Sequence, residues 1–178
     1  MTAAAIADLA RRLDRLEAES AIRRLTAAYF ELCDRLGPDT DLDALGALFA
    51  ADAVWQGKGS RYGAAFGSHR GRAAIVAMLA RYRGPPAHFA LNAHFLSGET
   101  IEVEEDHARG RWLMLQASTY SAGGSDLRSA RLSLEFNREA GPWRIARFET
   151  ENLFSRGIDR WDDGAPMPVP VPQEERKP

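Results

Sequence analysis

The spacing of apolar residues changes once along this chain, near residue 87, and that change limits the folds it can adopt. In residues 3–36, 41–49 and 72–82 apolar side chains recur every three or four positions, which indicates amphipathic helices. From residue 88 onward they alternate with polar ones in runs that predict five strands, at 88–96, 99–104, 108–120, 127–137 and 143–154. Three helices followed by a meander of strands predict an α+β fold, with the helices on one face of a curved sheet.

Glycine and proline mark the boundaries of these elements. Gly37-Pro38 ends the first helix and Gly84-Pro85-Pro86 ends the third, while a break within the first helix near residues 19–21 remains open. The glycine-rich stretch 57–71 lacks the spacing of a phosphate-binding loop at a strand–helix junction. We expect one domain, 1–156, and an extended proline-rich tail, 157–178, that either docks on a neighbouring subunit or is disordered.

Composition and charge narrow the possible partners. The net charge of −2 over 178 residues does not favour broad binding to nucleic acid or to an anionic membrane. The single cysteine excludes an internal disulfide framework and a thiolate zinc cage. The N-terminal residues do not read as a secretion signal, and no apolar run approaches the roughly 20 residues of a membrane span. We therefore expect a cytoplasmic protein with no nucleic-acid or membrane partner.

Tyr29, Asp34 and His88 are the best candidates for chemistry, because a phenol, an acid and an imidazole can move a proton without a cofactor. Alternation places His88, Asn92 and His94 on one side of a strand, which is either a solvated face or the lining of a cavity. Tyr29 and Asp34 likewise could be a core phenol and a solvated helix end, and their spacing alone does not join them. His88 and His94 lie about 20 Å apart along the strand, too far to share a metal ion. We expect neither metal nor cofactor.

Segments 25–34 and 43–55, continued by 71–75, 88–92 and 141–145, resemble the SnoaL-like group of the NTF2-like superfamily. The resemblance covers roughly residues 5–155. It implies an NTF2-like cone in which three N-terminal helices pack on a strongly curved mixed or antiparallel sheet and enclose a cavity. Within the superfamily the chain is most similar to the branch of scytalone dehydratase, bile-acid dehydratase and hexachlorocyclohexane dehydrochlorinase.

That branch implies a catalytic pair, which matches Asp34 and His88, with Tyr29 at a third functional position. Substrate contacts are expected from residues on the helices and strands around the cavity: Trp55, Asn92, His94 and Phe148. One departure is that Phe148 occupies the position of an arginine common in these families. Arg147 beside it should face the other side of the strand. A positive charge in the cavity, and with it an anionic substrate, is thus less expected.

The resemblance implies a cofactor-independent lyase or isomerase, dehydratase-like, in which His88 abstracts a proton from a small hydrophobic or polycyclic ring compound. Asp34 would orient His88, so His88→Ala and Asp34→Asn should each abolish turnover. Two alternatives stay open: a polyketide-cyclase-like enzyme, and a non-catalytic ligand-binding or assembly domain. A homo-oligomer is expected, because a sheet face bearing Trp112, Leu113 and Leu115 needs a cover. The resemblance implies a trimer for the dehydratase branch and a dimer for other branches, so a trimer is favoured.

Overall fold

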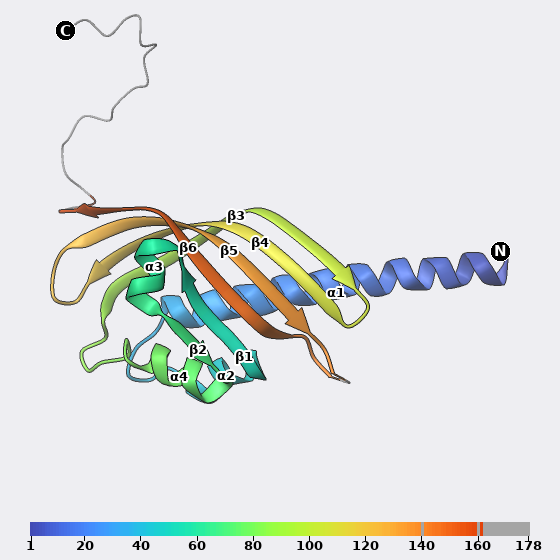
Figure 1. Ribbon diagram of the computed structural model, residues 1–178, viewed down its shortest axis with the longest axis horizontal. Helices are drawn as coiled ribbons and strands as arrows, with labels where there is room; N and C mark the ends of the chain where they lie inside the picture. Colours follow the sequence, from blue (N-terminus) through green and yellow to red (C-terminus); the bar gives the residue numbers. More distant parts are fainter. Residues whose placement is uncertain (140, 160, 162–178) are drawn as a thin grey trace, which may run out of the picture.

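The computed structural model describes residues 1–139, 141–159 and 161, and Figure 1 shows their arrangement. The elements follow one another as α1 (Ala3–Asp34), α2 (Leu42–Ala47), β1 (Phe49–Lys58), α3 (Gly59–Phe66), β2 (Ser68–Arg70), α4 (Arg72–Ala80), β3 (Phe89–Glu104), β4 (His107–Tyr120), β5 (Ser125–Asn137) and β6 (Arg144–Ile158). Within these residues no helix is long and apolar enough to cross a membrane.

The strands form one mixed sheet of six in the order β2-β1-β6-β5-β4-β3. Neighbouring strands are antiparallel except β1 and β6, which are parallel. Helix α1 runs along one face of the sheet and projects beyond it at its N-terminal end (Figure 1). The predicted α+β class is confirmed: helices cover a curved sheet that stays open rather than closing into a barrel.

The predicted helices and strands correspond to observed elements, but the observed structure differs from the predicted one in several places. Helix α1 is continuous through residues 19–21, and the two strands predicted at 88–96 and 99–104 form a single strand, β3, with a register shift between Ser97 and Thr100. The glycine-rich stretch contains α3 and β2, which alternation and periodicity did not predict. Strand β6 continues to Ile158, two residues into the predicted tail, and the rest of that tail from residue 162 lies outside the described residues.

The core lies between the helices and the concave face of the sheet. On β4 and β5 it is the even-numbered residues that point inward, as Trp112, Leu132 and Leu134 illustrate. Trp112 is only 4% exposed, whereas Leu113 is 44% exposed. The prediction that Trp112 shares an exposed face with the leucines is therefore wrong, because successive residues of a strand point to opposite faces.

Candidate active site

A cavity of about 140 Å³ lies between the helices and the concave face of the sheet. Aromatic rings from α1, β1, α3, the segment after α4, β3 and β6 form much of its wall: Tyr29, Phe30, Trp55, Tyr62, Phe66, Tyr82, Phe89 and Phe148. Its polar lining comes mainly from three adjacent strands and the residue just before β3: His88, Asn92, His94, Gln116 and Arg128. The cavity has mostly apolar walls and a few convergent polar groups, as small-molecule sites do.

Asp34 and His94 form a close carboxylate–imidazole contact at this cavity. Asp34 Oδ1 lies 2.5 Å from His94 Nδ1, and the other carboxylate oxygen accepts a hydrogen bond from the His94 backbone N–H at 3.3 Å. Both side chains are largely buried, with 27% of Asp34 and 10% of His94 exposed. The Asp34 carboxylate at the end of α1 therefore contacts His94 at two atoms, the ring nitrogen Nδ1 and the backbone nitrogen. The other ring nitrogen, Nε2, is not bound by Asp34.

The expected pairing of Asp34 with His88 is wrong, since the structure places Asp34 on His94. The two histidines are six residues apart, and the C-terminal end of α1 meets β3 at His94 rather than at the start of the strand. His88 precedes β3 and is exposed. Its backbone N–H donates to the Tyr82 carbonyl at 3.1 Å, and its ring meets Tyr82 and Tyr120 edge-on, each at 5.3 Å between centroids. His88 thus belongs to the mouth of the cavity.

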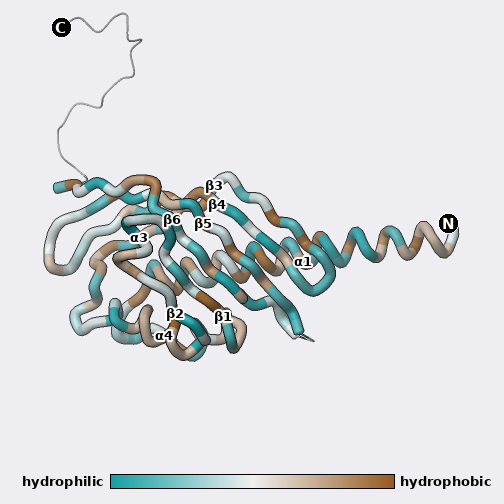
Figure 2. The backbone as a smooth tube through the Cα atoms, in the orientation of Figure 1, coloured by the Kyte–Doolittle hydropathy of each residue, from teal (hydrophilic) through white to brown (hydrophobic). Residues whose placement is uncertain are grey.

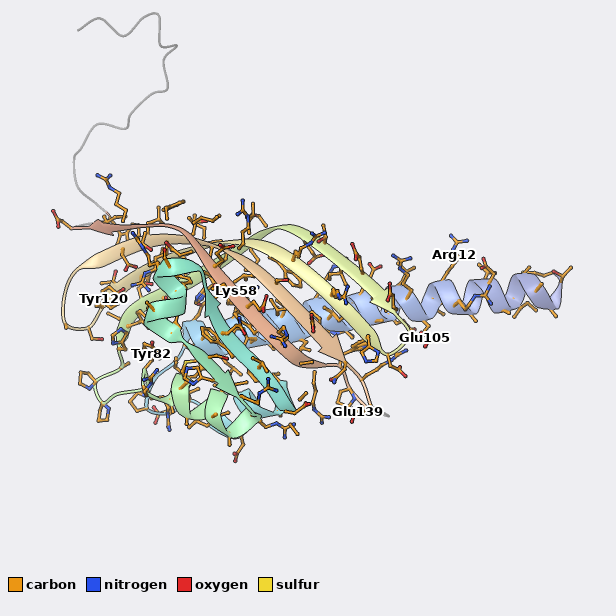
Figure 3. All side chains as sticks on the ribbon, in the orientation of Figure 1. Arg12, Lys58, Tyr82, Glu105, Tyr120 and Glu139 are labelled. Atoms are coloured by element: carbon orange, nitrogen blue, oxygen red, sulfur yellow. The ribbon has the colours of Figure 1, made fainter. Side chains whose placement is uncertain are left out.

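Figure 3 labels the two tyrosines beside His88, Tyr82 and Tyr120, at one end of the sheet, and Glu105 and Glu139 at the other. Phe89 joins this aromatic group, although simple alternation from Asn92 would point it outward. The register of β3 with β4 shifts between Phe89 and Leu91, which indicates an extra residue that resets the alternation. This irregularity brings one more ring to the cavity mouth.

Tyr29 lies at the buried end of the cavity. Its hydroxyl accepts a hydrogen bond from Trp55 Nε1 at 3.0 Å, and its ring packs 5.0 Å from that of Phe148. Trp55 and Phe148 stack with parallel rings 5.5 Å apart. Burial raises the pKa of the Tyr29 phenol well above its usual value, so this hydroxyl keeps its proton. Of the predicted site residues, Tyr29, Trp55 and Phe148 all line the cavity.

Asn92 connects the end of α1 to the sheet. Its Nδ2 donates to the Cys33 carbonyl at 3.3 Å, and its Oδ1 accepts hydrogen bonds from Gln116 Nε2 and Ser118 Oγ, both at 2.8 Å. Asn92 is half-buried, Gln116 and Ser118 are buried, and each of the three side chains forms at least two of these hydrogen bonds or a further one between Gln116 Nε2 and Ser118 Oγ at 3.1 Å. The network fixes the residue next to Asp34, and therefore the position of the carboxylate relative to β3.

Gln116, Ser118, Arg128 and the α3 residues were not predicted as part of the site. The sequence did contain a signal for Gln116 and Ser118, because these two polar residues continue a row of inward-facing residues on β4 that includes Trp112 and Met114. A polar residue at an inward position of a strand is informative, since it needs a partner or a ligand.

Arg147 lies outside the cavity, as its position in the strand predicted. Its guanidinium pairs with Glu135 at 3.7 Å and with Glu149 at 3.5 Å. Among the described residues, no group of three His, Cys, Asp or Glu side chains is arranged to hold a metal ion.

Comparison with solved structures shows the same fold in several proteins. A hexachlorocyclohexane dehydrochlorinase from Novosphingobium barchaimii is 20% identical with a TM-score of 0.69, covering 89% of this chain and 99% of its own. A scytalone dehydratase candidate from Novosphingobium aromaticivorans is 21% identical with a TM-score of 0.66, covering 82% and 89%. An NTF2-like protein with a cystatin-like fold, also from N. aromaticivorans, is 30% identical with a TM-score of 0.66, covering 83% and 89%. No curated protein matches the chain.

The family model of the SnoaL-like domain matches residues 14–149. This range contains all the cavity-lining residues except Thr150, the Asp34–His94 pair and every strand up to the middle of β6. The chain therefore belongs to the SnoaL-like domain family, within the NTF2-like fold that the sequence resemblance implied.

Proposed function

We propose that this protein is a lyase or isomerase that needs no cofactor and uses His94 as its general base. The observation that carries the proposal is the 2.5 Å contact between Asp34 Oδ1 and His94 Nδ1 at the wall of a largely aromatic cavity. A carboxylate on Nδ1 holds the proton there, so Nε2 is the basic nitrogen. The same carboxylate stabilises the imidazolium that forms when Nε2 takes a proton. Positioned general base catalysis of this kind gives about 10²–10⁴-fold.

The reaction begins with removal of a carbon-bound proton from the substrate by His94. The electron pair left on carbon then either expels a leaving group from the neighbouring carbon or moves into an adjacent carbonyl. Tyr29 is suited to donate a hydrogen bond to the group that gains negative charge, because its oxygen accepts from Trp55 while its own proton is retained. A buried donor aimed at developing charge contributes more than it would in water.

The size of the cavity favours a compact substrate. About 140 Å³ is close to the roughly 150 Å³ of an engineered protein cavity that binds benzene. One six-membered ring between Trp55, Phe148 and Phe30 matches this volume better than a polycyclic compound. The structural relatives include a dehydrochlorinase and a dehydratase candidate by name, so elimination of chloride or water from a ring compound is the first reaction to test.

A polyketide-cyclase-like reaction with Asp34 as the main acid or base is less well supported. Asp34 is not among the residues that line the cavity, and both of its oxygens contact His94. It is placed to act through the imidazole and not on a substrate directly. A purely ligand-binding domain would need the cavity, but would have no use for a carboxylate–imidazole pair beside it.

The test is a screen of cyclic chlorides and alcohols for elimination, and of cyclic ketones for exchange of the α-proton in D₂O, followed by substitutions on the active compound. We expect His94→Gln to lower kcat by at least about 10²-fold, in line with the loss of a general base. His88→Gln is the matched control. It removes an imidazole at the mouth of the same cavity, and kcat should stay within a few-fold of wild type.

A His94→Gln protein that keeps its thermal stability and near-wild-type kcat would rule the mechanism out. A large kcat loss in His88→Gln alone would return the role of base to His88. The kcat of Asp34→Asn should lie between the kcat values of His94→Gln and His88→Gln, because the His94 imidazole remains but loses its anionic partner.

A further inference from the structure

Two rows of polar residues cross three neighbouring strands on the concave face of the sheet. Each row follows the cross-strand register from β3 through β4 to β5: Asn92, Ser118 and Asp126 in one, His94, Gln116 and Arg128 in the other. Arg128 is therefore two strands from the proposed base. With about 4.8 Å between strands, its Cα lies roughly 10 Å from that of His94. Arg128 also lines the cavity, so the cavity does contain a cationic side chain, supplied by β5.

Asp126 and Tyr120 hold Arg128 in place. Its Nε and Nη2 donate to Asp126 Oδ2 at 2.8 and 2.5 Å, and Nη2 also donates to the Tyr120 hydroxyl. The Arg128 guanidinium carbon lies 5.9 Å from the centroid of the Tyr120 ring. A guanidinium carries five N–H donors. Within the part of the chain that the structure describes, Nη1 donates to no protein group, so Arg128 is oriented and still has donors free.

Arginines outnumber acidic residues along the groove beside Arg128. Arg128, together with Tyr62 and Phe66, stands between the cavity and a groove of about 560 Å³. The groove is also lined by Arg61 and Arg156, neither of which forms an ion pair with another described residue. The charged residues that line this groove are therefore three arginines, Arg61, Arg128 and Arg156, and one aspartate, Asp126. A concave surface of one sign concentrates ligands of the opposite sign.

We infer that this end of the cavity binds an anionic group, a carboxylate, carried by the ring substrate. The inference rests on the proposed function for the position of the ring, with its reacting C–H at His94 and its face against Trp55. The carboxylate then reaches Arg128 Nη1, and a longer acidic side chain continues into the groove towards Arg61 and Arg156. Arginine suits this role because its planar donors match the oxygens of a carboxylate.

This inference revises an expectation drawn from the last strand. Phe148 stands where an arginine was expected, and Arg147 pairs with Glu135 and Glu149. The strand β6 therefore contributes no cation to the cavity. The register of β5 shows that the cationic side chain is Arg128, which lies two strands away from His94.

The test compares two ring compounds of nearly the same shape: trans-cinnamate, which has a carboxylate, and benzalacetone, which has a methyl ketone in its place. Dissociation constants are measured by isothermal titration calorimetry on the full chain. Wild-type protein should bind cinnamate at least tenfold more tightly than benzalacetone. Arg128→Gln should weaken cinnamate at least tenfold and leave benzalacetone within about twofold. Arg131→Gln is the matched control, because it removes an arginine of the same strand on the exposed face, and should change neither constant.

Arg128→Gln leaves Asp126 without its main partner, so the double variant Asp126→Asn with Arg128→Gln is measured as well. It removes both charges, should unfold near the wild-type temperature, and should have lost the preference for cinnamate. An unchanged preference in this variant, or equal weakening of both compounds by Arg128→Gln, would overturn the anion site. So would a wild-type protein that binds cinnamate no better than benzalacetone.

Binding is measured without turnover, which separates this inference from the proposed mechanism. His94→Gln should keep the preference for cinnamate even though it loses activity. If His94→Gln stays active, the mechanism fails while the anion site stands. If Arg128→Gln has no effect on binding, the anion site fails while the mechanism stands.

Discussion

At the scale of single residues, the sequence identified which side chains face the cavity more reliably than which of them meet. Alternation put Asn92 and His94 on one side of a strand, and both line the cavity. It could not decide whether Asp34 would reach His88 or His94. That contact depends on how far α1 extends over β3, and helix packing on a sheet is set by the whole core and not by local spacing. A shift of six residues along a strand is about 20 Å, which changes the chemistry completely.

For a single residue, Cys33, we predict how the stability of the protein depends on pH. Burial raises the pKa of its thiol from 9.0 to about 12, and the negative charge of Asp34 acts in the same direction. A raised pKa favours the protonated form in the folded state. The stabilisation is therefore complete below the unfolded pKa near 9 and is lost as pH rises towards 12. The unfolding temperature should fall between pH 8.5 and 10.5, and Cys33→Ala should show a smaller fall over the same range. Equal slopes for the two proteins would show that Cys33 does not contribute.

At the scale of elements, the long strands were predictable and α3 was not. β4, and β5 from Ala130 onward, show regular alternation of buried and exposed residues, which is the pattern the sequence displays. Helix α3 lies in a glycine-rich stretch with weak helical preference. Its formation depends on tertiary contacts, because Tyr62 and Phe66 pack into the cavity wall and Tyr62 is buried. Local pattern cannot reveal an element that long-range packing stabilises.

A second prediction concerns the packing of α3 against Gly57 of β1. A Cβ at this position would collide with the backbone carbonyl of Tyr62, lying 2.6 Å from its carbon atom, and would also crowd Phe66. Gly57→Ala should therefore displace α3 from β1, lower the unfolding temperature and weaken binding of benzalacetone. Gly63→Ala is the matched control within α3, since the nearest atom to its Cβ is 3.8 Å away. Alanine in a helix is favoured over glycine by up to about 1 kcal/mol, so this variant should be as stable as wild type or more so. Similar unfolding temperatures for both variants would show that α3 tolerates the displacement.

At the scale of the whole molecule, exposed apolar residues gather in two places, and Figure 2 shows the apolar bands along α1. One is a stripe on the projecting part of α1, made of Ile6, Leu9, Leu13 and Leu16. At 100° per residue it lies roughly opposite the stripe of α1 that packs into the core through Ile22 and Tyr29. The other is the outer face of the sheet, where Leu91, Phe95, Leu113 and Leu115 are exposed on β3 and β4. The sequence predicted the second surface from Leu113 and Leu115, but could not show that Phe95 lies directly across from Leu115.

The last prediction is that the protein is a homo-oligomer, a trimer rather than a dimer, assembled through the outer face of the sheet. Phe95 and Leu115 are cross-strand partners, so their side chains form one continuous apolar surface. The stripe on α1 spans only about two heptads, fewer than the three to four that indicate a coiled coil. In size-exclusion chromatography with light scattering, the wild-type mass should be three times 19.6 kDa. Phe95→Glu with Leu115→Glu should give the mass of one chain, while Leu9→Glu with Leu13→Glu should leave the trimer intact. If only the α1 variant dissociates the oligomer, the interface lies on the helix and not on the sheet. A monomeric wild-type protein would contradict the prediction, because the apolar face of the sheet would then remain exposed to water.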